Sequence, residues 1–163
     1  MIRTPSPEAG DLKTLSFTVR PSSPSDTDRL VDIWRGAVDA THDFLDPGDR
    51  QAIETEVRAF FPTANFQVAV DSQDVPLGFM LLNDAHLEAL FISPDRRGQG
   101  IGKLLMQRAM GAHEVLTVDV NEQNVHALGF YERLGFEITG RSSIDGQGRP
   151  YPLLHMQLAS HHR

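Results

Sequence analysis

One glycine-rich stretch decides how the rest of the chain is interpreted: Phe91-Ile92-Ser93-Pro94-Asp95-Arg96-Arg97-Gly98-Gln99-Gly100-Ile101-Gly102-Lys103. An apolar run over residues 87–92 stops at Ser93-Pro94, and an amphipathic run over residues 103–112 follows the glycines. This order predicts a strand, a loop and a helix. Because glycine has no Cβ, the backbone N–H groups of the loop can point into one concavity, where the helix N-terminus adds unpaired donors. The stretch therefore predicts a site for an anionic phosphate group.

The spacing of the glycines argues against two common phosphate motifs. A Walker A loop needs a glycine at position 97 and a serine or threonine at position 104, where this chain has Arg97 and Leu104. A dinucleotide fingerprint needs Gly-x-Gly-x-x-Gly, and its third glycine position holds Lys103 or Leu105, depending on the register. A nucleotide-binding module is thus disfavoured. A plain glycine turn before a helix stays open as the alternative for the loop taken alone.

The loop fits a third pattern, Arg/Gln-x-x-Gly-x-Gly/Ala, and in this it resembles the coenzyme A diphosphate loop of the GNAT family of N-acetyltransferases. A second segment, residues 121–136, is similar to that family's Asn-x-x-Ala-x-x-Phe-Tyr-x-x-x-Gly-Phe pattern. The positions that match are Asn124, Ala127, Phe130, Tyr131, Gly135 and Phe136. Two weak motifs in the right order on the right elements are more specific together than either is alone.

Hydrophobic periodicity and turn residues predict the order of elements. Strands are expected over residues 15–20, 66–70, 77–82, 86–92, 116–120, 136–141 and 151–158. Helices are expected over residues 25–40, 47–61, 103–112 and 124–134. The order β-α-α-β-β-β-α-β-α-β-β predicts an α/β fold with a mixed sheet and helices on its faces, and it is also the order of the GNAT fold. We expect a flexible tail over residues 1–14 and a single domain over residues 15–160.

The first two predicted helices carry start signals and apolar faces. Ser25 to Asp28 resembles a capping box, and Asp46 before Pro47 predicts an N-cap followed by proline at the first helical position. The face predicted to be buried in the first helix consists of Leu30, Ile33, Trp34, Ala37 and Val38. In the second helix it consists of Ile53, Val57, Phe60 and Phe61.

Composition narrows the classes of function. Of the 163 residues 40% are hydrophobic, which suffices for a core, and without cysteine there is neither a disulfide nor a thiol nucleophile. No apolar run of about 18 residues predicts a membrane span, and the N-terminus lacks the apolar segment of a secretory signal. A net charge of −7 argues against a nucleic-acid partner and suits an amine substrate. We expect a cytoplasmic protein. We also expect no metal site, since His161 and His162 lack the paired spacing of metal ligands.

The resemblance implies transfer of the acetyl group of acetyl-CoA to a primary amine, by direct attack in a ternary complex. It also implies that the strands over residues 86–92 and 116–120 splay apart after Ile92 and Val120, so that the coenzyme pairs with the free strand edge. The residues implied to hold the coenzyme are Leu90, Phe91, Ile92, Arg97, Gly98, Gln99, Gly100, Ile101, Gly102, Lys103, Asn121, Asn124 and Ala127. Asn124 could equally act only as a helix cap, and Asn121 as an ordinary residue at a strand end.

Tyr131 and Glu88 are the candidates for proton transfer. By resemblance Tyr131 lies near the thioester sulfur, and a phenol with its ordinary pKa of about 10 can donate a proton at pH 7. The alternative for Tyr131 is an aromatic ring that merely packs beside Phe130. Glu88 lies where many family members carry a catalytic glutamate, and strict alternation puts it on the face of Leu90 and Ile92.

A charge on such a face is costly unless it lines a cleft, so Glu88 is the candidate general base. Two alternatives stay open. Glu88 could be an ordinary solvent-exposed residue, and a chain of water molecules or His86 could serve as the base.

The acceptor site is expected between the loop after the first helix and the loop before the last strand. These loops carry His42, Phe44 and Tyr151. His42 could bind or deprotonate an amine, or it could only cap a helix C-terminus, and Tyr151 could line a pocket or pack in the core. One fold hosts many functions, so the acceptor stays open between a small-molecule amine and a protein amine. The last strand could pair across a homodimer. The alternative function is an acyl-CoA-binding regulatory module, which would need the loop but neither Tyr131 nor Glu88.

Overall fold

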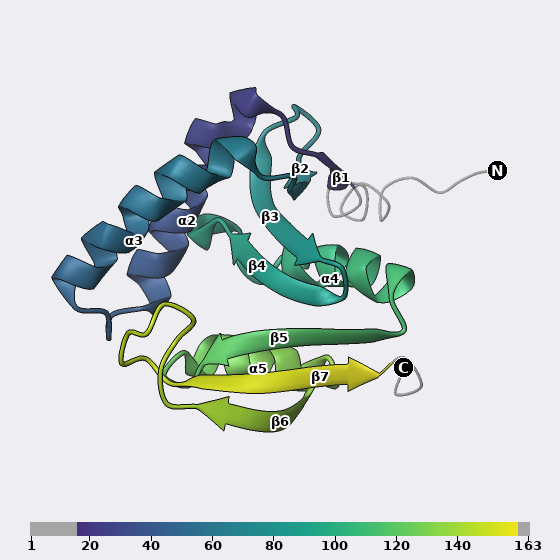
Figure 1. The fold of residues 1–163 in the computed structure, drawn as a ribbon. Helices are drawn as coiled ribbons and strands as arrows, with labels where there is room; N and C mark the ends of the chain where they lie inside the picture. Colours follow the sequence, from purple (N-terminus) through teal and green to yellow (C-terminus); the bar gives the residue numbers. More distant parts are fainter. Residues whose placement is uncertain (1–15, 160–163) are drawn as a thin grey trace.

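A seven-stranded mixed sheet runs through the part of the chain that the computed structural model describes, residues 16–159 (Figure 1). Its strands are β1 (Thr18–Pro21), β2 (Gln67–Val70), β3 (Pro76–Asn83), β4 (His86–Ile92), β5 (Val115–Asn121), β6 (Glu137–Ser142) and β7 (Leu153–Ala159). They lie in the order β1-β2-β3-β4-β5-β7-β6, and every neighbouring pair is antiparallel except β4 and β5. The predicted α/β fold is confirmed, whereas the predicted tail over residues 1–14 lies outside the described residues.

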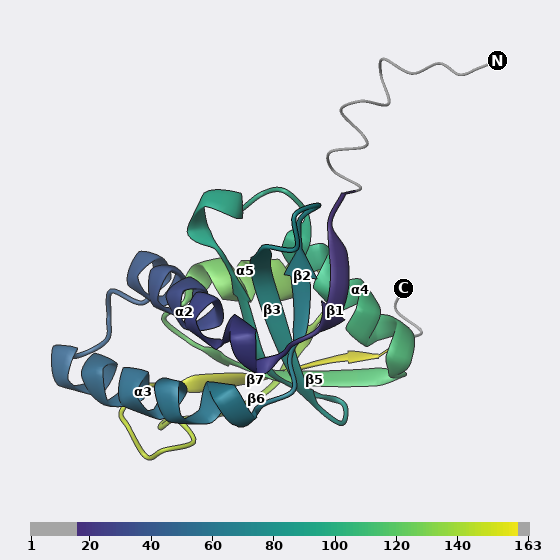
Figure 2. The same cartoon turned by 90° about the horizontal axis from the view of Figure 1, so that it is seen from above.

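Helices cover both faces of the sheet (Figures 1 and 2). On one face lie α2 (Thr27–Thr41) and α3 (Pro47–Phe60), and on the other lie α4 (Ile101–Ala112) and α5 (Val125–Arg133). Short 3-10 turns precede or follow them at η1 (Pro24–Asp26), η2 (Phe61–Thr63) and η3 (Pro94–Arg96). Because side chains alternate along a strand, Phe79 of β3 packs in the core under α2 and Met80 packs in the core under α4. The sheet thus separates two apolar cores.

The start of α2 differs from the prediction, although its buried face is confirmed. The backbone N–H of Ser23 donates to Asp26 Oδ2 at 2.8 Å, so the capping contact precedes η1 and not Ser25. Pro24 explains the shift, because proline favours the first position of a helical turn and draws Ser25 into η1. The predicted cap of α3 is confirmed, since the Asp46 carboxylate accepts from the N–H groups of the next turn.

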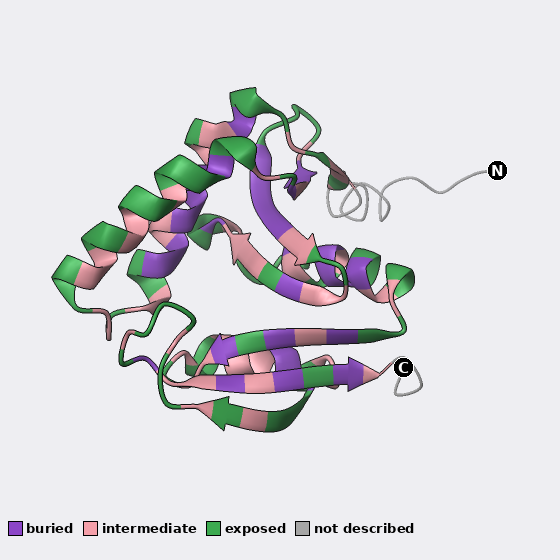
Figure 3. Cartoon of the chain, viewed as in Figure 1, coloured by how far each residue is buried: buried purple, intermediate pink, exposed green. Residues whose placement is uncertain are grey.

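The predicted buried face of α3 is partly wrong. Helix α3 contains no fully buried residue (Figure 3), and Phe60 is 49% exposed. Phe61 is buried, but it belongs to η2, where the tighter turn redirects the side chain into the core under α2. Ile53 and Val57 pack against that core while staying half-buried. Apolar packing alone therefore holds α3 only loosely.

Charged contacts supply a second anchor for α3. The Glu54 carboxylate accepts from Arg35 of α2 at 2.9 Å, and from Arg50 and Arg58 of its own helix at 2.7 and 3.1 Å. The Arg35 guanidinium, followed by that of Arg50, lowers the pKa of Glu54 to about 2. A lowered folded-state pKa means that the stabilisation is present above the ordinary pKa of 4.5 and is lost as pH falls toward 2.

We expect Glu54→Gln to reduce the free energy of unfolding by about 1 kcal/mol at pH 7, because exposed ion pairs contribute only fractions of this each. The difference from the parent protein should shrink as pH falls from 4.5 toward 2. Urea unfolding at several pH values measures it, with Glu132→Gln on exposed α5 surface as the control. A difference that does not change with pH would contradict the ion-pair explanation.

Candidate active site

Strands β4 and β5 are parallel but pair at only two positions, which are the start of β4 and the middle of β5. The register joins His86 to Thr117 and Leu87 to Val118, and no further pair follows. The strands therefore diverge from residues 88 and 119 onward, whereas the sequence predicted divergence only after Ile92 (Figure 1). The other edge of β4 is bonded to β3 along its length, so the edge of residues 88–92 that faces β5 is free. A gap opens there in the middle of the sheet.

A β-bulge in β4 determines where Glu88 points. Two consecutive residues of β3 pair with Leu87 and Ala89, so Glu88 has no residue opposite it. A bulge shifts the alternation of side chains. Leu90 and Ile92 pack against the core under α4, whereas Glu88 lines a cavity on the α2 side together with Ala89. The prediction that Glu88 shares the face of Leu90 and Ile92 is therefore wrong.

Three adjoining cavities lie along the gap, and Phe91 lines all three of them. The first, about 140 Å³, reaches from Arg97 and Gly102 to Tyr131. The second, about 130 Å³, lies between β4 and β5 and shares Tyr131 with the first. The third, about 590 Å³, lies under α2 and α3 and shares Glu88 with the second. We call the first the donor-side cavity and the third the acceptor-side cavity.

The glycine-rich loop ends at the N-terminus of α4, which begins at Ile101 and not at the predicted residue 103. Gly98 and Gly100 have φ values of 77° and 85°, in the left-handed region that favours glycine. Gly100 is the N-cap, and the first helical hydrogen bond runs from the N–H of Leu104 to its carbonyl. Within residues 16–159 no acceptor is recorded for the backbone N–H groups of residues 98–103. Such free donors at the positive end of a helix dipole suit an anion.

The side chains of the loop differ in what they can contribute. Arg97 and Gly102 line the donor-side cavity. Ile101 is 1% exposed and packs in the core under α4, so only its N–H can serve a ligand. Gln99 accepts a weak hydrogen bond of 3.4 Å from the arginine three residues before it, and Lys103 is exposed. The predicted phosphate site is thus made mainly by backbone.

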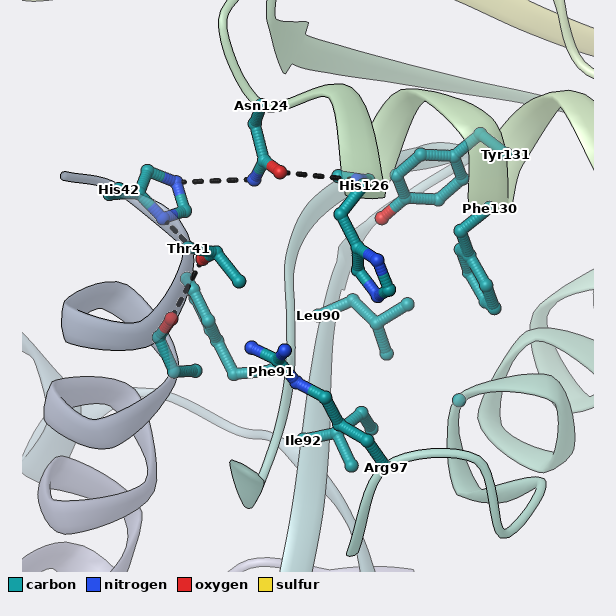
Figure 4. Close-up of a pocket in the computed structure, with 13 residues that line it drawn as sticks. Thr41, His42, Leu90, Phe91, Ile92, Arg97, Asn124, His126, Phe130 and Tyr131 are labelled. Carbon is teal, nitrogen blue, oxygen red and sulfur yellow. Dashed lines mark hydrogen bonds between the residues drawn. The ribbon is translucent and has the colours of Figure 1, made fainter. Parts of the chain in front are cut away.

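Tyr131 lies where the donor-side cavity meets the gap (Figure 4). Its ring is held edge-on between Phe130 and Phe136, with centroids 5.2 and 5.4 Å away. No hydrogen bond to its hydroxyl is recorded from the described chain, and the side chain is buried. Burial raises the pKa of Tyr131 above its ordinary value, so the phenol stays protonated. A buried hydroxyl without a protein partner is free to donate to a bound molecule.

A chain of hydrogen bonds links α5 to α2 across the gap (Figure 4). The N–H of Ala127 donates to Asn124 Oδ1 at 3.1 Å, which leaves the Asn124 amide to donate to His42 Nε2 at 3.4 Å. The Thr41 hydroxyl donates to the carbonyl of Ala37 at 2.7 Å, so it accepts from His42 Nδ1, also at 2.7 Å. His42 is therefore neutral, and burial, which lowers the pKa of His42, favours the same state. Both ring nitrogens thus have protein partners, and His42 also lines the donor-side cavity and the gap.

Phe44 and Tyr151 lie beside this chain of contacts but line none of the three cavities. The Tyr151 hydroxyl donates to Asp49 Oδ2 at 2.5 Å and accepts from the N–H of Asp46 at 3.0 Å, which ties the loop before β7 to the start of α3. Phe44 packs between His42 and Tyr151, with ring centroids 5.2 and 6.1 Å away. These contacts give Phe44 and Tyr151 a structural explanation.

The structure adds Asp119 and His126 to the residues that line the cavities. Asp119 accepts from His155 Nδ1 at 2.6 Å and lies 3.6 Å from His86 Nε2. Asp119 carries no sequence signal, because it alternates with buried valines as any residue on the open face of a strand does. Asn121 also lines the gap, although its side chain is already used to accept from the N–H of residue 123.

Comparison with known proteins identifies the family. The sequence profile of the acetyltransferase (GNAT) domain matches residues 37–158, and the chain therefore belongs to the GNAT family of acetyltransferases. It is 50% identical over 142 residues to a Salmonella typhimurium protein named peptidyl-lysine N-acetyltransferase YjaB, covering 87% of this chain and 98% of that protein. The Escherichia coli protein of the same name is 49% identical, with 86% and 95% covered. The solution structure of apo YjaB from Escherichia coli matches with a TM-score of 0.83 at 48% identity, covering 86% of this chain and 96% of that one.

These comparisons confirm the predicted family, the predicted fold and the prediction of an N-acetyltransferase that takes its acetyl group from acetyl-CoA. They favour an enzyme over the regulatory module that binds without turnover. Within residues 16–159, no helix is both long and apolar enough to cross a membrane. In the same residues, no group of three or more potential ligands could hold a metal ion.

Proposed function

We propose that the chain acetylates the side-chain amine of lysine in a peptide or protein, by direct attack on acetyl-CoA in a ternary complex. The row of adjoining cavities carries this proposal, because it runs from the loop at Arg97, past Tyr131, to Glu88 and the cavity under α2 and α3. Tyr131 lines both the first and the second cavity, and Glu88 lines both the second and the third. The names of the two YjaB relatives support peptidyl-lysine as the acceptor.

On the donor side, the free N–H groups at the start of α4 hold the coenzyme diphosphate. The pantetheine arm then lies in the gap and bonds to the free edge of β4 around Leu90, Phe91 and Ile92, as an added strand would. This arrangement carries the thioester toward Tyr131. The predicted coenzyme contacts of Asn124 and Ala127 fit the same path, since both line the gap.

The reaction needs two proton losses from the acceptor nitrogen and one proton gain by the leaving sulfur. A lysine ammonium entering from the acceptor-side cavity meets Glu88, which takes its proton directly or through water and leaves a neutral amine. The amine nitrogen attacks the thioester carbonyl, the C–N bond forms and the C–S bond breaks. Tyr131 gives its proton to the departing thiolate, and the proton that the amide nitrogen loses restores the phenol through solvent. The products are an acetylated lysine, free coenzyme A and one proton.

We expect Glu88→Gln to lower kcat/KM by about 100-fold near neutral pH, within the usual range for loss of a general base. The pH–rate profile of the parent enzyme should have an acidic limb that the variant lacks. Initial rates from about pH 5 to pH 9 measure both effects. The control is Glu137→Gln, which removes an exposed carboxylate on β6. An acidic limb that survives in Glu88→Gln would assign the base to another group, such as bound water.

The acceptor assignment is tested with a blocked peptide that contains one lysine and with the same peptide carrying arginine instead. The lysine peptide should gain one acetyl group on Nε, identified by fragment mass spectrometry, and coenzyme A thiol should appear in equal amount. Acetylation of small amines without acetylation of the peptide would overturn the choice of acceptor. Coenzyme binding without any turnover would overturn the enzyme assignment. A cytoplasmic location and a homodimer stay predictions from the sequence.

A further inference from the structure

The acceptor-side cavity is larger and more apolar than a lysine side chain requires. Its volume of about 590 Å³ falls in the range of about 300–1,000 Å³ that ligand pockets occupy. Five aromatic residues line it: Trp34, Phe60, Phe61, Phe66 and Phe91. Glu88, at the junction with the gap, is the charged residue of the lining. The amine therefore has one electrostatic partner, and most of the remaining wall is apolar.

This distribution of charge fixes how an acceptor can lie. An ammonium placed deep in the cavity would lose its water without meeting a carboxylate, which is costly. The ammonium must therefore stay beside Glu88, at the end nearest the thioester, and an uncharged group must fill the aromatic part. The methylene stem of a lysine occupies only a portion of that space. The remainder suits a second apolar side chain carried by the same acceptor.

Phe60 offers an exposed apolar surface against which this second side chain can pack. It is 49% exposed, and it lies at the end of α3, a helix without any fully buried residue in this structure. Neighbouring Val57, also on α3, lines the same cavity. Apolar side chains left open beside an unfilled aromatic cavity gain contact area when an apolar group enters. Burying one large apolar side chain should strengthen binding by about tenfold or more.

We infer that the acceptor-side cavity selects lysines that have a large aromatic or aliphatic side chain next to them in the peptide, with the amine at Glu88 and the neighbouring side chain against Phe60. This inference rests on the proposed function, since it names the peptide that the same site takes. It also moves the selective contacts away from the predicted residues Phe44 and Tyr151, which line none of the three cavities.

A set of peptides that differ in one residue tests the selection by turnover. Each peptide has a blocked N-terminus and a single lysine, next to phenylalanine, leucine, glycine or aspartate. We expect kcat/KM for the phenylalanine peptide to exceed that of the glycine peptide by about tenfold or more, as burial of one apolar side chain implies. The aspartate peptide should do no better than the glycine peptide. Equal kcat/KM values for the four peptides would overturn the inference.

A pair of matched variants locates the effect. Phe60→Ala should reduce the ratio of kcat/KM between the phenylalanine and glycine peptides at least threefold. It should leave KM for acetyl-CoA unchanged, because Phe60 lines neither the donor-side cavity nor the gap. Ile138→Ala on β6 removes a side chain that is equally exposed, at 50%, but lines none of the three cavities, and it should keep the ratio. A ratio that Phe60→Ala leaves intact would place the selection elsewhere and overturn the inference.

Binding can be followed without turnover because the chain has one tryptophan, Trp34, and it lines the cavity. Peptides with acetyl-lysine in place of lysine are titrated in the presence of coenzyme A while the Trp34 fluorescence is recorded. The phenylalanine peptide should bind about tenfold more tightly than the glycine peptide. If acetyl transfer occurs but the two peptides bind equally tightly, the inferred selection would be wrong and the proposed function would remain. If the two peptides differ in affinity but no acetyl group is transferred, the proposed function would be wrong, and the cavity would still bind an apolar side chain.

Discussion

Replacing Tyr131 by phenylalanine should lower kcat by about 10²–10⁴-fold, the usual effect of removing a general acid, and change KM for acetyl-CoA little. Phenylalanine keeps the ring contacts with Phe130 and Phe136 and removes only the hydroxyl. Because no protein partner of that hydroxyl is recorded in residues 16–159, its loss leaves no protein group unpaired. The thermal stability of Tyr131→Phe should therefore equal or exceed that of the parent protein. Steady-state kinetics and thermal unfolding measure the two quantities.

The other tyrosine of the chain, Tyr151, is the matched control. Tyr151→Phe breaks the hydrogen bonds to Asp49 and Asp46, so it should lower the melting temperature. It should leave kcat nearly unchanged, because Tyr151 lines none of the three cavities. If Tyr131→Phe also kept its kcat at every pH, Tyr131 would be a packed aromatic ring and not the acid.

The raised pKa of Tyr131 predicts how activity should depend on alkaline pH. Burial disfavours the phenolate, so the acid form persists above the ordinary phenol pKa of about 10. An alkaline loss of activity below about pH 10 should then come from another group and appear in Tyr131→Phe as well. The parent enzyme and the variant, compared over the same pH range, test this expectation.

The main features of the fold could be predicted because their signals are local. The apolar run, the glycines and the amphipathic run of residues 87–112 lie next to one another in the chain, and the structure contains β4, the loop and α4 in that order. The buried stripe of α2 follows from helical periodicity alone. The β-bulge at Glu88 could not be predicted, because it depends on how β4 pairs with β3.

The same distinction applies to the site. Tyr131 and Asn124 were found through a motif contained in one short segment, and both line the gap. The contact between His42 and Asn124 joins residues 82 positions apart, and that between Tyr151 and Asp49 joins residues 102 positions apart. No local pattern encodes such pairs, so the sequence left open whether His42 and Tyr151 face a substrate or the protein. Both side chains have hydrogen-bond partners within the protein, but only His42 also lines the cavities, so its predicted contact with a substrate stays a prediction.

Substitution of Gly100 by valine should weaken coenzyme A binding by about 100-fold, because left-handed strain of about 1–3 kcal/mol adds to the loss of hydrogen bonds to the diphosphate. A Cβ at Gly100 would meet no protein atom within 4 Å, so crowding inside the protein is not the cause. The cause is φ, which is 85° and disfavours a β-branched residue strongly. To relieve that strain the loop must turn, and the N–H groups of residues 101–103 then lose their common direction.

Calorimetric titration with coenzyme A measures this effect, and Gly111→Val on the same helix is the control. A Cβ at Gly111 also meets nothing within 4 Å, but Gly111 does not have a left-handed φ and lies at the opposite end of α4 from the loop. The control variant should therefore bind coenzyme A as the parent protein does. Intact affinity in Gly100→Val would show that the diphosphate does not bind at the start of α4. Loss of affinity in Gly100→Val alone, with melting temperatures that match the control, would tie the coenzyme to these backbone donors.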